Sequence, residues 1–197
     1  MAMFVLGAVA ASAASAASPA WWVAGTLLKG TEAISETTTV TKAFSITANS
    51  YGVECGSVAL EGASIEAEKT AKFKAIAFGG CKVLESSSCT VPTTIKTEPL
   101  TATLEGTTGH FKLNFAPTTM GKPLVVIKFS GAKCALETAT LTGTMACNYP
   151  GVETEAIIHE LEFTATSGSH LKEGSLEVKL AGIDDFWLTP EKKWSVH

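Results

Sequence analysis

The chain has 197 residues and a formal net charge of -4, and Lys is its only strong cation, because the sequence contains no Arg. The 15 Lys residues are spread along the chain, whereas nucleic-acid binding favours a clustered basic face and forked guanidinium groups. Composition therefore argues against nucleic acid as a partner. A chain of this length can bury the core of one β sandwich or barrel, so we expect a single domain.

Residues 1–20 have the pattern of a secretory signal peptide, with an apolar run followed by small residues. The apolar run is about half of the roughly 20 residues that a membrane-spanning helix needs, so a cleaved signal is favoured over a membrane anchor. Cleavage is expected after Ala16, Ala17 or Ala20, although no Lys or Arg precedes the apolar run. We expect a secreted, extracellular protein whose mature part, residues 21–197, is one β domain without a stable membrane span.

Beyond this segment, apolar and polar residues alternate in short runs separated by turn residues, a pattern typical of antiparallel strands. The run 71–78 is apolar on both faces, so we expect it to be covered on both sides. The clearest hairpin joins residues 100–104 to residues 111–115 through a turn with two glycines. Residues 124–129 are the strongest candidate for a central strand.

Both ends of the mature chain are also expected to form hairpins, the first around Ala24-Gly25 and the last around residues 189–192. No sustained helical periodicity occurs between them. The pattern predicts about eleven or twelve short strands. We therefore predict an all-β fold, an antiparallel β sandwich, with a β barrel as the alternative architecture.

Several motifs are distributed over the mature chain: W-W-V-A-G-T-L-L, G-V-E-C, F-G-G-C-K-V, C-T-V-P-T-T-I-K-T-E-P-L, F-S-G-A-K-C-A-L and a Leu-rich strand before W-S-V. In these motifs the chain resembles a group of secreted β-rich proteins from actinobacterial genomes. The resemblance extends over nearly the whole span from Trp21 to Val196. It implies export and β structure, and it supplies no mechanism.

Five cysteines in an exported chain indicate disulfide bonds and leave one thiol over. A zinc site is not favoured, because the sequence has no C-x-x-C pair and no His close to a Cys. Spacing leaves the connectivity open, since any four cysteines allow three pairings. The resemblance places Cys55, Cys81, Cys89 and Cys134 in the shared segments, which makes Cys147 the expected free thiol.

Two disulfide patterns remain in competition. The preferred pattern joins Cys55 to Cys81 and Cys89 to Cys134, and it would tie the loop between Cys81 and Cys89 to strands before and after it. The competing pattern has a local Cys81–Cys89 bridge and joins Cys134 to Cys147. In that pattern the free thiol would be Cys55.

No catalytic, cofactor-binding or metal-binding constellation is expected. His159-Glu160 begins a metalloprotease signature, but Phe163 stands where the second His is required. The serine-hydrolase elbow and the glycine-rich phosphate loop are both absent. Asp184-Asp185 could ligate a cation or form an acid pair, but is interpreted as a solvated turn. His159 is in phase with apolar residues of one strand face, so it is interpreted as a hydrogen-bonded core or edge histidine.

The four tryptophans offer another candidate site, because exposed aromatic rings hold sugars or peptides on many extracellular β domains. Adjacent Trp residues in a strand point to opposite faces, so one of them can be exposed. Core packing at the chain ends is the favoured interpretation, and a ligand platform is the alternative. The platform residues would be Trp21, Trp22, Trp187 and Trp194.

The sequence thus predicts a secreted, non-enzymatic structural or interaction protein without a cofactor. Its partner would be an extracellular protein or a polysaccharide. A carbohydrate or cell-wall binding module is the alternative, on the strength of the tryptophans, and an extracellular hydrolase ranks third.

Overall fold

The computed structural model describes residues 18–84, 88–132, 134, 136–164 and 168–197. In this part of the chain the regular structure is almost entirely β-strand, which confirms the all-β class. The elements are β1 (Trp21–Val23), β2 (Thr26–Leu27), β3 (Thr31–Ile34), β4 (Thr39–Thr47), β5 (Gly52–Cys55), β6 (Ser57–Glu61), β7 (Ser64–Glu66), η1 (Ala67–Lys69), β8 (Thr70–Phe73), β9 (Ala75–Gly79), β10 (Lys82–Val83), β11 (Thr94–Lys96), β12 (Leu100–Thr107), β13 (His110–Pro117), β14 (Val125–Lys128), β15 (Thr138–Asn148), β16 (Ile158–Phe163), β17 (His170–Glu173), β18 (Leu176–Thr189) and β19 (Trp194–Val196).

Eight of these strands close into an antiparallel barrel, in the order β3-β7-β8-β12-β13-β15-β16-β18. Closure comes from β3, which pairs with β7 on one edge and with the end of β18 on the other. Of the two predicted architectures, the structure has the barrel. A barrel of eight strands has an interior just wide enough for side chains to fill.

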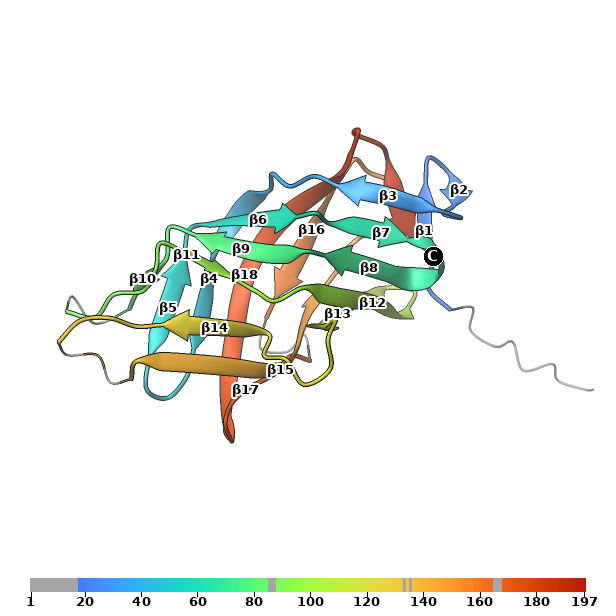
Figure 1. Cartoon of the computed structure of the whole chain (residues 1–197). Coiled ribbons are helices and arrows are strands. Elements are labelled where there is room, and N and C mark those ends of the chain that lie inside the picture. Colours follow the sequence, from blue (N-terminus) through green and yellow to red (C-terminus); the bar gives the residue numbers. More distant parts are fainter. Residues whose placement is uncertain (1–17, 85–87, 133, 135, 165–167) are drawn as a thin grey trace, which may run out of the picture.

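The remaining strands lengthen the molecule beyond this barrel. Strands β6 and β9 continue β7 and β8 in line (Figure 1), pair with each other and add β11. The ladder β4-β5-β10 extends from β18, while β14 and β17 pair with the first part of β15. The strands outnumber the predicted eleven or twelve, because runs such as residues 71–78 are divided by a break, here at Lys74.

The local predictions have mixed outcomes. The predicted hairpins at Ala24-Gly25 and at residues 100–115 are both present. Strand β9 is buried on both faces, as expected. The predicted central strand is wrong, because β14 pairs with β15 and meets Thr97 only through an isolated bridge, and Val126 is 40% exposed. The segment is rich in apolar residues because Val125 and Ile127 form a buried face, while Val126 lies on the exposed face.

The predicted hairpin at the end of the chain is also wrong. Strand β19 pairs with β1, at the opposite end of the sequence, with Trp21 opposite Val196. It cannot pair with the last part of β18, since both edges there are occupied, by Ile158 of β16 and Ile34 of β3. The small sheet β19-β1-β2 lies at the end of the barrel where β7 ends and β8 begins (Figure 1).

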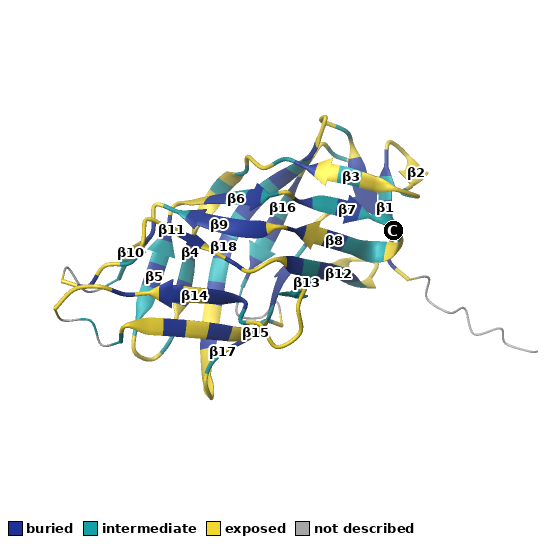
Figure 2. Cartoon of the chain, in the orientation of Figure 1, coloured by how far each residue is buried: buried dark blue, intermediate teal, exposed yellow. Residues whose placement is uncertain are grey.

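Aromatic side chains fill the barrel at this end. Trp194 is fully buried, and its ring centroid lies 4.7 Å from that of Phe186 and 5.8 Å from that of Trp21. Tyr149 contacts all three rings. Buried positions alternate with exposed ones along most barrel strands (Figure 2), so one face of each strand faces this core.

The two disulfides lie toward the other end of the molecule. They join Cys55 to Cys81, with Cα atoms 4.0 Å apart, and Cys89 to Cys134, with Cα atoms 4.9 Å apart. This is the pairing preferred above over the local Cys81–Cys89 bridge. Cys147 is the free cysteine and is buried.

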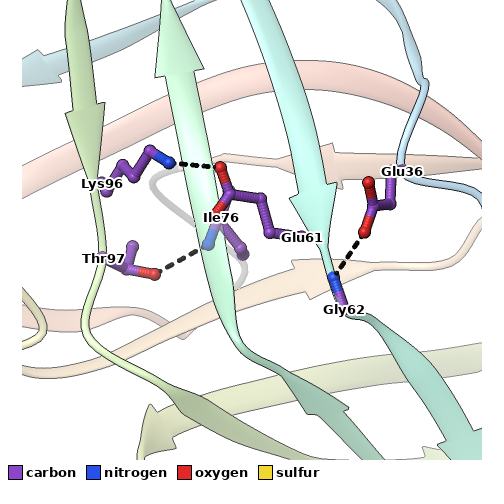
Figure 3. Close-up of polar contacts among 6 residues, drawn as sticks. All are labelled: Glu36, Glu61, Gly62, Ile76, Lys96 and Thr97. Carbon is purple, nitrogen blue, oxygen red and sulfur yellow. Dashed lines mark hydrogen bonds and ion pairs between the residues drawn. The ribbon is translucent and has the colours of Figure 1, made fainter.

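Thr97 completes the hydrogen bonding where the chain passes from β11 toward β12 (Figure 3). Its side-chain oxygen accepts a hydrogen bond from the backbone N–H of Ile76 at 2.9 Å, and its own N–H donates to the Ile76 carbonyl at 3.0 Å. Both residues are buried, so without this hydroxyl the N–H of Ile76 would have no hydrogen-bond acceptor. Nearby, Lys96 pairs with Glu61, and Gly62 donates to Glu36, on the surface.

Replacing Thr97 by Val is expected to lower the free energy of unfolding by about 1–3 kcal/mol, because a buried N–H loses its acceptor while side-chain volume is kept. The measurement is urea unfolding monitored by Trp fluorescence. Thr97→Ser is the matched control, since it keeps the hydroxyl and should retain most of the stability. Equal stability of the two variants would contradict the role given to the hydroxyl.

Candidate functional site

A small apolar cavity with one carboxyl group is the strongest candidate site in the described part of the chain. Its volume is about 10 Å³. Asp184 of β18 lies against it and is 1% exposed. The rest of the lining is apolar and comes from β4, β6, β8, β9, β13 and β16: Phe44, Val58, Leu60, Phe73, Ile76, Phe78, Phe115, Leu161 and Phe163.

Strand β18 places Asp184 inward through simple alternation. Even-numbered residues from Val178 to Leu188 are buried, and Asp184 continues this series between Gly182 and Phe186. Gly182 leaves room for the ring of Phe44, since a Cβ atom there would lie 2.7 Å from that ring. The register between β4 and β18 shifts on both sides of Ile183, next to Asp184.

The Asp184 carboxyl is set in an environment that disfavours its charged form. Burial raises its pKa from the ordinary value of 3.8 to about 7, and the negative charge of Asp185 also raises it. Hydrogen bonds with the Thr38 side chain and the Asp185 backbone lower the pKa by less. Oδ1 has no hydrogen-bond partner. A strongly shifted carboxyl in a cavity is typical of functional sites, and structural networks also produce such shifts.

The interpretation of Asp184-Asp185 as a solvated turn is therefore wrong. Both residues lie within the 14-residue strand β18, and only Asp185 faces outward. The signal was present in the sequence, because Asp184 occupies the apolar phase of Leu180, Phe186 and Leu188. Asp is depleted in strands and common in turns, which favoured the interpretation as a turn.

The four tryptophans do not form one platform. Trp21 and Trp194 are 1% and 0% exposed and belong to the aromatic cluster at the end of the barrel, so for these two the favoured interpretation of core packing is right and the alternative, a ligand platform, is wrong. Trp22 and Trp187 are partly exposed. Trp22 contacts the ring of His197 on the terminal sheet, whereas Trp187 lies opposite Ile158 on the outer face of the barrel.

The histidines do not assemble a catalytic group within the described residues. His159 is buried, as the sequence indicated, and its Nε2 lies 2.8 Å from the backbone oxygen of Trp194. Burial lowers the pKa of His159, and this hydrogen bond opposes the shift. His110, His170 and His197 are exposed.

Cys147 is unsuited to nucleophilic chemistry. Its side chain is fully buried in β15, opposite Leu113, and burial raises the pKa of the thiol. The reactive form of cysteine is the thiolate, which this environment disfavours.

The described residues contain no group of three or more His, Cys, Asp or Glu side chains that could hold a metal ion. Over the same ranges, no helix is long and apolar enough to cross a membrane. No protein-family model, curated protein or solved structure matches the chain.

Proposed function

We propose that this protein is a secreted, non-enzymatic structural or interaction protein that works in an oxidising compartment. The pair of disulfides carries the proposal, because such bonds persist in extracellular proteins and are rare in reducing compartments. Together they connect β5, the end of β9 and the loops around Cys89 and Cys134. The molecule would then present loops and the outer barrel face to an extracellular partner. The resemblance to secreted actinobacterial proteins supports the same proposal.

The start of the described chain bears on how the signal would be removed. Pro19 is buried, and the N–H of Ala20 donates to the carbonyl of His197 at 2.8 Å. Cleavage after Ala16 or Ala17 keeps these contacts, whereas cleavage after Ala20 removes them. We therefore favour one of the two earlier positions.

Mass spectrometry of the secreted, non-reduced protein tests the proposal. We expect a mature chain that has lost the N-terminal segment, with a single thiol, Cys147, alkylated in denaturant without reductant. Alkylation of all five cysteines without reductant, or retention of the protein inside the cell, would contradict it.

A carbohydrate-binding role is the second candidate, and the surface around Trp187 favours it. Trp187 and the 53% exposed Ile158 are paired across β18 and β16. The next outward pair on the same strands is Asp185 with Glu160. An aromatic ring beside carboxylates offers a stacking surface and hydrogen-bond acceptors, which are the groups that bind sugars.

Replacing Trp187 by Ala is expected to abolish pull-down of the protein by insoluble cell-wall polysaccharide, if this surface holds the sugar. Trp22→Ala is the matched control, because Trp22 is also partly exposed but lies on the terminal sheet. Unchanged binding by the Trp187 variant, or no binding by the parent protein, would exclude the second candidate.

A further inference from the structure

The cavity beside Asp184 leaves a polar atom without a partner. A buried water commonly makes about three hydrogen bonds, and a cavity of about 10 Å³ is at the lower limit for holding one. Among the described residues that line the cavity, Asp184 is the only polar one. A water there would lack further partners, so solvent cannot compensate a charge on Oδ1.

The Thr38 hydroxyl offers the carboxylate little compensation. It donates its one proton to the carbonyl of Val58 at 2.7 Å. Its effect on Asp184, which lowers the pKa of the carboxyl, is smaller than the effect of burial, which raises it.

Within the described part of the chain, no cationic side chain lines the cavity to balance the carboxyl. The titratable side chains on the surrounding strands do not line the cavity: Lys42 of β4, Glu54 of β5, Glu61 of β6, Lys72 of β8, His110 and Lys112 of β13, His159, Glu160 and Glu162 of β16, and Glu177, Lys179 and Asp185 of β18. His159 is also buried, but its ring packs against Trp194 at 4.2 Å. Ionised Asp184 would therefore be a buried charge without a counter-charge and with Oδ1 unpaired, which is costly.

We propose that Asp184 is a proton-binding site that controls the pairing of β4 with β18, so that the protonated acid keeps these strands paired and loss of the proton separates them. The β4–β18 ladder is interrupted beside Asp184, because its register shifts on both sides of Ile183. Separation of Thr39–Thr47 from Lys179–Asp185 would give water access to the carboxylate. This inference does not depend on the proposed function.

The sign of the pH dependence follows from the raised pKa of Asp184. The folded protein holds the proton up to about pH 7, while the unfolded chain releases it above about 3.8. The stabilisation from this group is complete below the lower value and is lost as the pH rises toward the upper value. The folding equilibrium constant should fall about tenfold per pH unit over this window, or about 10³-fold in total.

The test compares urea unfolding of the wild type, Asp184→Asn and Asp185→Asn between pH 4 and pH 8. Asp184→Asn keeps the shape of the neutral acid and cannot ionise, so it should gain about 10³-fold in folding equilibrium constant over the wild type across this range. Asp185→Asn is the control: it removes only a smaller contribution to the raised pKa of Asp184, so its stability should still fall with pH, over a somewhat narrower window. Parallel curves for the wild type and Asp184→Asn would overturn the proposal.

Amide hydrogen exchange locates the opening. Wild type and Asp184→Asn are compared at the same pH of 8, so that intrinsic exchange rates cancel. Lower global stability speeds exchange of the slowest amides everywhere in the wild type, so the informative quantity is any further increase. We expect this further increase in Thr39–Thr47 and Lys179–Asp185. Equal exchange in both proteins, or an increase that is uniform over the barrel, would contradict control of the β4–β18 pairing.

Discussion

Replacing Trp194 by Ala is expected to lower the free energy of unfolding by about 3–5 kcal/mol, the usual loss when a large buried aromatic side chain is truncated. Trp194 is fully buried and contacts the rings of Trp21, Tyr149, His159 and Phe186. Its Nε1 has no hydrogen-bond partner, so the loss measures packing. Denaturant or thermal unfolding gives the value.

Trp187→Ala is the matched control for this loss, because it removes the same side chain from a partly exposed position. It should cost no more than about 1 kcal/mol, as is usual for surface substitutions away from special features. If the two variants were equally stable, the assignment of Trp194 to the core of the barrel end would be wrong. The comparison also separates the packing tryptophans from the one that remains a candidate for ligand binding.

Removing the disulfides is expected to have the second large effect. The bonds join residues separated by 26 and 45 positions, and in the chain-entropy model each contributes about 3–4 kcal/mol by restricting the unfolded chain. The variants are Cys55→Ala with Cys81→Ala, and Cys89→Ala with Cys134→Ala. Alanine is preferred to serine because Cys55, Cys81 and Cys89 are buried.

Reductant provides the control for these variants. It should destabilise the wild type, and it should affect each double variant less, since one bond is already absent. Cys147→Ala should respond to reductant as the wild type does, because Cys147 forms no disulfide. A wild-type melting temperature that does not change under reductant would contradict a stabilising role for both bonds.

The strands and their turns could be predicted from the sequence because they depend on neighbouring residues. Alternation from Leu100 to Leu104 and from Phe111 to Phe115 marked the hairpin β12–β13, and the glycines between them marked its turn. Alternation also predicted that Trp21 and Trp22 face opposite sides, which the structure confirms. Which of the two would face the core could not be predicted, because that depends on the sheet they join.

The candidate site shows the same division. The phase of Asp184 along β18 was readable in the sequence as part of the series from Val178 to Leu188. The phenyl rings around it come from strands far apart in the chain, such as Phe44 of β4 and Phe163 of β16. Their convergence depends on barrel closure, so the absence of a counter-charge among the described residues that line the cavity could not be predicted.

The sequence by itself determined the all-β class, the main hairpins and the inward or outward phase along individual strands, because these follow from the two-residue period of a strand. The tertiary structure alone decided that the domain is a barrel, through the pairing of Ile34 with Leu188, and that the two chain ends meet, through Trp21 and Val196. Such pairings join residues more than a hundred positions apart. Their stability comes from the apolar core that they enclose together, which no local pattern encodes.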